Sequence, residues 1–280
     1  MRTKGVVGVV AVLLGVPLVQ ASVIGAAVSQ DAADDLFVTE QIDNPGDLNP
    51  LQHMFRIESA PRVFDSSPLG TNVPRGMADF SGTSNPADTV GIIRTTTDGR
   101  LFGVYDTNAG AAPGFGQSRT LAASWTFDVS STSGPLDVSV EMAATGQFDA
   151  ADDFPNFDGA DSFSFTYQFD TGPVLDLFTF DIITGSFTHT TEGGNTETFT
   201  TTIEVNGATI LDNVFQVLQS APLVGSGSTL TVGFAANTDP GFFDQEAFAF
   251  RNIEVSVVPA QSVGVVLLPV GIMATRRRAY

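Results

Sequence analysis

The sequence predicts an all-β protein folded as an antiparallel two-sheet β-sandwich. Short runs of alternating apolar and polar residues follow one another, turn residues separate them, and no segment has the periodicity of a helix. Aromatic and β-branched residues dominate these runs, and 23 phenylalanines can supply a core. Between two apolar terminal segments about 230 residues remain, which is a normal size for one sandwich domain.

The first strand with a clear inner face lies around ASWTFDV. Trp125, the only tryptophan, alternates there with Phe127 and Val129. An exposed tryptophan could stack on a sugar ring, but this alternation favours a position in the core.

The next strands show the alternation most clearly. In SFSFTYQF (162–169) the aromatic residues fall on one face and the small polar residues on the other. The runs 198–205 and 229–236 follow the same rule. Their predicted inner residues are Phe163, Phe165, Tyr167 and Phe169 in the first run, Phe199, Ile203 and Val205 in the second, and Leu230, Val232 and Phe234 in the third.

The last strand, AFAFRNIEVSV, changes parity along its length. Phe248 and Phe250 are even-numbered, whereas Ile253 and Val255 are odd-numbered. A regular strand would turn one of these sets to solvent. The sequence therefore predicts a β-bulge at Arg251-Asn252, or else a strand that is buried on both faces there.

Turn signals separate these runs. The strongest is Asn206-Gly207 between IEV and ATIL, which predicts a two-residue hairpin. Other turns are predicted at Asp98-Gly99, Asp158-Gly159, Gly193-Gly194-Asn195 and Asp239-Pro240-Gly241.

The N-terminal segment, 1–27, has the layout of a secretory signal peptide. Arg2 and Lys4 precede an apolar run of about 15 residues, and small residues follow. Cleavage after Ala21 or after Ala27 fits this pattern, and the residues do not choose between them. An uncleaved membrane anchor is the alternative, although a span needs about 20 residues.

The charges separate by sign along the chain. The terminal segments contain no acidic residue, and the part between them holds all 31 acidic residues and only seven arginines, which leaves a net charge of −24. Such a field repels nucleic acid and anionic membranes and attracts divalent cations. Lys4 is the only lysine and there is no cysteine, which excludes disulfides, Schiff bases and isopeptide cross-links in the central part.

Several segments resemble the jelly-roll sandwiches of secreted bacterial proteins. They are LFGVYDTNAG (101–110), FDAADDF (148–154), SFTYQFDTG (164–172) and FFDQEAFAFRNIEV (242–255). The resemblance covers 91–257 and implies a jelly-roll-like fold for a single domain, 28–258. Arg251 stands where the usual pattern has Asp, so a calcium ligand is not carried over to that position.

The C-terminal segment, 259–280, is similar to the PEP-CTERM sorting signal. Val258-Pro259 comes before an apolar run, 263–274, and then Arg276, Arg277 and Arg278. The resemblance implies recognition by an exosortase-type membrane protease, although Val258-Pro259-Ala260-Gln261 diverges from the Glu and second Pro of the motif. As a helix the apolar run would span about 18 Å of a ~30 Å hydrocarbon core. An ordinary C-terminal anchor and a core strand with a basic end are the alternatives.

An acidic loop is the candidate metal site. Hard cations such as Ca²⁺ take six to eight oxygen ligands, and crowded carboxylates can supply them. The predicted ligands are Asp149, Asp152, Asp153, Asp158 and Asp161, with Asp239, Asp244 and Glu246 as partners if the loops converge. A solvated acidic loop without metal is the alternative. Phe242 and Phe243, after a Pro-Gly turn, are candidates for an exposed ligand contact.

Catalytic motifs are absent from the sequence. His53 and His189 are the only histidines, and neither G-x-S-x-G nor H-E-x-x-H occurs. We therefore expect no catalytic residues, although a glycosidase needs only two carboxylates about 5 to 10 Å apart. The sequence predicts a non-enzymatic extracellular protein, structural or adhesive, at the cell surface or in an exopolysaccharide matrix, with transient membrane contact through its tail. A calcium-assisted carbohydrate-binding module and a glycan-active hydrolase are the alternatives.

Overall fold

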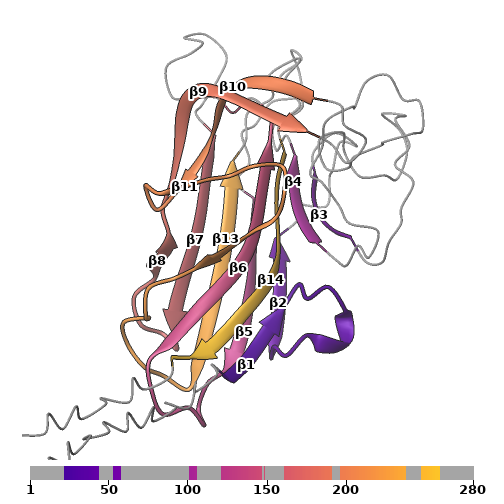
Figure 1. Cartoon of the computed structure of the whole chain (residues 1–280). Coiled ribbons are helices and arrows are strands. Elements are labelled where there is room, and N and C mark those ends of the chain that lie inside the picture. Colours follow the sequence, from indigo (N-terminus) through magenta and orange to yellow (C-terminus); the bar gives the residue numbers. More distant parts are fainter. Residues whose placement is uncertain are drawn as a thin grey trace, which may run out of the picture.

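A computed structural model of the 280-residue chain describes residues 22–43, 53–57, 101–105, 121–146, 148, 161–190, 196–237 and 247–258. Within these residues the protein is almost entirely β (Figure 1), as the sequence predicts. The single helical element there is a three-residue 3-10 turn, η1 (Ala32–Asp34). No helix in the described part is long and apolar enough to cross a membrane.

The first of three sheets has six strands. Its order is β12-β6-β14-β4-β3, and β1 pairs with β14 on the same side as β4. The bounds are β1 (Ser22–Ala27), β3 (His53–Ile57), β4 (Leu101–Tyr105), β6 (Leu136–Thr145), β12 (Gln216–Gln219) and β14 (Ala247–Val257).

The second sheet has five strands in the order β2-β5-β13-β7-β8, all paired antiparallel. The bounds are β2 (Thr39–Asp43), β5 (Leu121–Asp128), β7 (Ser162–Phe169), β8 (Leu175–Phe178) and β13 (Thr229–Asn237). From β4 to β7, and again from β12 to β14, the chain passes back and forth between the two sheets. The predicted two-sheet antiparallel sandwich is therefore confirmed.

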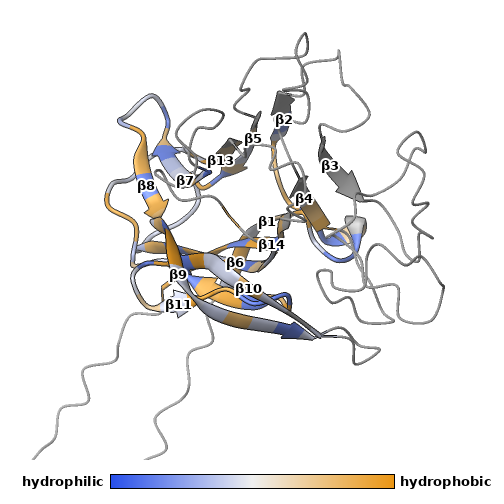
Figure 2. Ribbon diagram, turned by 90° about the horizontal axis from the view of Figure 1, so that it is seen from above, coloured by the Kyte–Doolittle hydropathy of each residue, from blue (hydrophilic) through white to orange (hydrophobic). Residues whose placement is uncertain are grey.

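A small third sheet has the order β11-β10-β9 and lies beside β6 (Figure 2). Its strands are β9 (Phe180–Thr190), β10 (Thr196–Val205) and β11 (Thr209–Ile210). Asn206 and Gly207 both have positive φ, at 56° and 60°, and the Ala208 N–H donates to the Val205 carbonyl at 3.2 Å. The hairpin forms where the sequence predicts it, with the positive φ values that favour Asn-Gly. Its loop has three residues and not the predicted two, because Val205 pairs with Thr209 and leaves Asn206, Gly207 and Ala208 between the strands.

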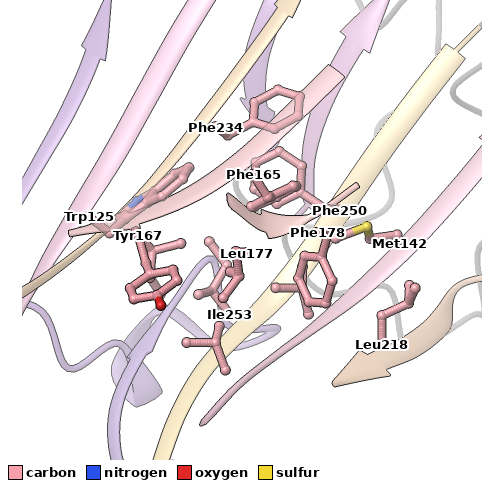
Figure 3. Packing of buried hydrophobic residues seen from close by; sticks show 14 of the residues in the cluster. Trp125, Met142, Phe165, Tyr167, Leu177, Phe178, Leu218, Phe234, Phe250 and Ile253 are labelled. Carbon is pink, nitrogen blue, oxygen red and sulfur yellow. The ribbon is translucent and has the colours of Figure 1, made fainter. Parts of the chain in front are cut away.

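Aromatic residues from both sheets form the core (Figure 3). Phe250 of β14 lies edge-on to Phe165 of β7, with ring centroids 4.9 Å apart, and Trp125 of β5 lies 5.6 Å from Phe102 of β4. The predicted inner faces are confirmed, because the residues named above for 198–205 and 229–236 are buried. Burying a phenylalanine side chain stabilises the folded state by about 1.5–3 kcal/mol relative to leaving it in water. The sum over this core stabilises a protein that has no disulfides.

The predicted bulge in β14 is also confirmed. Arg251 pairs with Glu141 and Glu254 pairs with Ser139, so β14 has one residue more than β6 between these two pairs. Asn252 takes φ +51°, and this turns Ile253 and Val255 to the same core as Phe248 and Phe250. Glu141 holds the bulge in place, since Arg251 donates to it at 2.6 Å and the Asn252 amide donates at 2.8 Å.

The two ends of the described chain lie side by side. Ser22 pairs with Val257, and the Val258 N–H donates to the Pro135 carbonyl at 2.8 Å. The start of β1 and the end of β14 therefore lie at the same end of the sandwich, which is at the bottom of Figure 1. We refer to this end as the terminal end.

Candidate functional site

The opposite end of the sandwich gathers four connections between strands. Register pairs place the end of β2 beside the start of β5, the end of β4 beside the start of β3, and the end of β6 beside the start of β14. The end of β13 lies beside the starts of both β5 and β7. The pairs are Asp43↔Ala122, His53↔Tyr105, Ala236↔Leu121, Asn237↔Ser162 and Ala247↔Thr145. We call this end the loop end. The connections themselves, 44–52, 106–120, 149–160 and 238–246, lie outside the described residues.

The two acidic segments start from a common base at the loop end. Phe148, which follows β6, lies 5.8 Å from Phe163 of β7, and Phe163 lies 4.9 Å from Phe248 of β14. The residues that flank 149–160 and 238–246 are therefore packed together. The strand ends that carry these two loops therefore converge, while the loops and the predicted shared metal site lie outside the described residues.

Most of the predicted metal ligands lie in those connections. Asp161 is described and is buried, with 6% of its surface exposed. The other predicted ligands, Asp149, Asp152, Asp153 and Asp158, lie outside the described residues, as do Phe242 and Phe243. Among the residues that the structure describes, no three His, Cys, Asp or Glu side chains group together in a way that could hold a metal ion.

The sorting residues fall almost entirely beyond the described part. Val258 is partly exposed at the end of β14, whereas Pro259 and Arg276, Arg277 and Arg278 are not described. The structure therefore gives only the point at which this segment leaves the sandwich.

Trp125 is a core residue, as predicted. Its side chain is fully buried between Phe102 and Phe250, and its indole N–H donates to Glu40 Oε1 at 2.9 Å. It therefore presents no flat surface on which a sugar could stack.

A hollow beside β9 contains the buried side chain of His189, for which the sequence predicts no catalytic role. The hollow measures about 500 Å³, and its lining includes His189, Asp212, Ile210, Val214 and Gln216. His189 is 2% exposed and its Nδ1 lies 2.9 Å from the Thr145 hydroxyl, while Nε2 lies 4.0 Å from Asp212 Oδ1. Burial lowers the pKa of His189, and Asp212 opposes this shift by favouring the charged ring.

In this arrangement His189 of β9 is joined to Thr145 of β6 by a buried hydrogen bond, and the two residues do not form a nucleophile–base pair. Among the described residues, the hydroxyl bonded to His189 is that of Thr145, which is fully buried at the end of β6. A substrate in the hollow could not reach it. No signal in the sequence connects 145, 189 and 212, because these residues meet only through tertiary packing.

The outer face of the second sheet forms a shallow hollow of about 290 Å³. Small residues cover it, among them Ser124 of β5, Ser164 and Thr166 of β7 and Gly233 of β13. A Cβ at Gly233 would lie 2.9 Å from Thr166 Oγ1, so Thr166 packs directly against the backbone of Gly233 on this face. This is the polar side predicted for SFSFTYQF.

No family model matches the chain, and no curated protein matches it. A solved structure of TmCBM61 in complex with beta-1,4-galactotriose is similar with a TM-score of 0.28 and 4% sequence identity, covering 57% of this chain and 72% of that chain. A likeness at this level assigns neither a family nor a ligand to this chain.

Proposed function

We propose that this protein is a non-enzymatic β-sandwich that is exported from the cell and retained at its surface or in an exopolysaccharide matrix, where it acts as a structural or adhesive component. The observation that supports this most is the arrangement of charge and apolar segments. A domain with a net charge of −24 and no lysine lies between two apolar segments that carry only basic charges.

The described geometry supports the same proposal. Because Ser22 pairs with Val257, both apolar segments join the sandwich at the terminal end. If either apolar segment reaches a membrane, the terminal end faces that membrane. The loop end, from which the two acidic segments start, then points away from it. This arrangement also keeps the acidic residues away from anionic lipid.

Sorting through the C-terminal segment is the first step to test. An exosortase-type membrane protease would remove the tail, so mass spectrometry of the released extracellular protein should find no peptide containing Arg276, Arg277 or Arg278. Replacing all three arginines by Gln should leave unprocessed protein in the membrane fraction, because the positive-inside signal is lost. Tyr280→Phe is the matched control in the same tail and should sort normally. Recovery of the three arginines in the released protein would contradict cleavage.

A calcium-assisted carbohydrate-binding function is the second candidate. The packed base of Phe148, Phe163 and Phe248 favours it, because it brings the flanks of 149–160 and 238–246 together. Carboxylates from both segments would then supply oxygen ligands, and cation binding would relieve their mutual repulsion.

Thermal unfolding with calcium and with a chelator tests this second function. The melting temperature should rise with Ca²⁺ in the native protein and should not rise in the double variant Asp152→Asn, Asp153→Asn. Asp176→Asn, on β8 away from the loop end, is the control and should keep the response. A glycan array run with and without calcium then tests ligand binding, and release of reducing ends from the bound glycan would indicate the hydrolase instead. If the melting temperature of the native protein is the same with calcium and with the chelator, calcium binding is contradicted.

A further inference from the structure

We propose that signal cleavage occurs between Ala21 and Ser22, so that β1 is the first strand of the mature protein. This inference rests on the proposed export. Hydrolysis of this peptide bond by water would leave a carboxylate on Ala21 and an ammonium group on Ser22. The Val19-Gln20-Ala21 sequence supplies the small residue that such cleavage needs.

The pairing of β1 supplies the first argument. β1 runs antiparallel to β14 from Ser22↔Val257 to Ala27↔Ile253, while β4 covers β14 only from Phe248 to Phe250. Cleavage after Ala27 would remove this neighbour and leave one side of β14 unpaired along its second half. Unpaired backbone groups next to a core carry a desolvation cost, and an open strand edge invites aggregation.

The burial of the residues that follow β1 supplies the second argument. Val28 is fully buried, and its carbonyl accepts from the Asn252 N–H at 3.0 Å. A chain that began at Val28 would place a charged α-ammonium group at this buried position, which is strongly unfavourable. Ser22 is exposed, so an ammonium group there stays in water.

Gly25 supplies the third argument. A Cβ at this position would lie 2.5 Å from Cδ1 of the Phe127 ring, and Phe127 is itself fully buried. The backbone of β1 is therefore packed directly on the core. Ala26 and Ala27, at 7% and 0% exposed, continue this contact. The small residues that look like a cleavage region in the sequence are small because they pack in a sheet.

The direct test is N-terminal sequencing of the protein exported from cells that express the full chain. We expect Ser22-Val23-Ile24. A sequence that starts Val28-Ser29-Gln30 would overturn the inference and leave the proposed export intact. Protein retained in the cytosol with Met1 in place would overturn both.

The variant Gly25→Val gives an independent readout. It should lower the melting temperature of the exported protein by several degrees, because the new side chain meets Phe127. Val23→Ala is the matched control, since Val23 is 45% exposed, and it should change the melting temperature little. If Gly25→Val is recovered in too small an amount, Ile24→Ala removes a milder contact with the core. Equal melting temperatures for the native protein and all these variants would mean that 22–27 is absent from the mature chain, and would overturn the inference.

Discussion

Single residues at turns show how the fold uses its acidic side chains. Asp170 follows β7 with φ +46°, and its Oδ1 accepts from the Thr229 N–H at 2.8 Å and from the Ser228 N–H at 3.0 Å. It also accepts from both hydroxyls of these residues. One carboxylate thereby ties the end of β7 to the start of β13.

These bonds predict a pH dependence. The backbone bond from Thr229 is the largest cause of a lowered pKa at Asp170, followed by the Ser228 hydroxyl. A folded-state pKa below the unfolded value gives stability that is complete above about pH 3.8 and is lost as the pH falls through the folded pKa. Asp170→Asn should therefore show a smaller loss of melting temperature in this acidic range than the native protein. Asp176→Asn, the control on β8, should follow the native curve.

His189 predicts a second pH effect in a different range. Because burial lowers its folded-state pKa, the unfolded chain takes up the proton first as the pH falls. The stability is complete above an unfolded pKa of about 6.5 and declines as the pH approaches the folded value. Thermal melts between about pH 7 and about pH 5 should show a steeper decline in the native protein than in His189→Gln. His53→Gln is the control; if it flattens the curve and His189→Gln does not, the assignment to His189 is wrong.

At the scale of the strand, the bulge in β14 keeps two sets of apolar residues in one core. Asn252 adopts a left-handed conformation that costs most L-residues about 1–2 kcal/mol. Asn252→Val should therefore lower the free energy of unfolding by at least this amount, and Asn252→Gly should lower it less, as measured by urea denaturation. Equal effects of both substitutions would show that the backbone conformation is not the main contribution of Asn252.

The strands also show what the sequence could and could not predict. Alternation identified the inner faces of 162–169, 198–205 and 229–236, and the parity change identified the bulge, because side-chain direction follows directly from residue spacing. The sequence leaves the role of residues 22–27 open, since small apolar residues suit both a cleavage region and a closely packed strand. The pairing with β14 adds an observation that residue spacing does not contain, and the proposed cleavage after Ala21 rests on it.

The candidate sites were harder to predict than the strands. Thr145, His189 and Asp212 are far apart in the chain and meet only after folding. The acidic loop was found from its composition, but composition does not say whether carboxylates converge on an ion or remain in water. The strand pairing of β6 with β14 and of β7 with β13 shows where the ends of these strands lie. The sequence alone does not give this information.

At the scale of the whole molecule, the acidic charge destabilises the compact state through self-repulsion. The part between the terminal segments has a net charge of −24. Raising the NaCl concentration from about 10 mM to about 0.5 M shortens the Debye length roughly sevenfold and should raise the melting temperature. Choline chloride at the same concentrations is the control for specific sodium binding. A melting temperature that falls with both salts would show that favourable ion pairs outweigh the repulsion.

The position of β14 decides how the domain bears mechanical load. A force applied through Val258 pulls along this strand, which has β6 on one side and β1 and β4 on the other. The hydrogen bonds to these neighbours lie across the direction of pull, so they share the load in shear and must fail together. An edge strand pulled in the same direction would share the load with one neighbour only. A domain tethered by its last strand in this way resists extension from the point where it is attached.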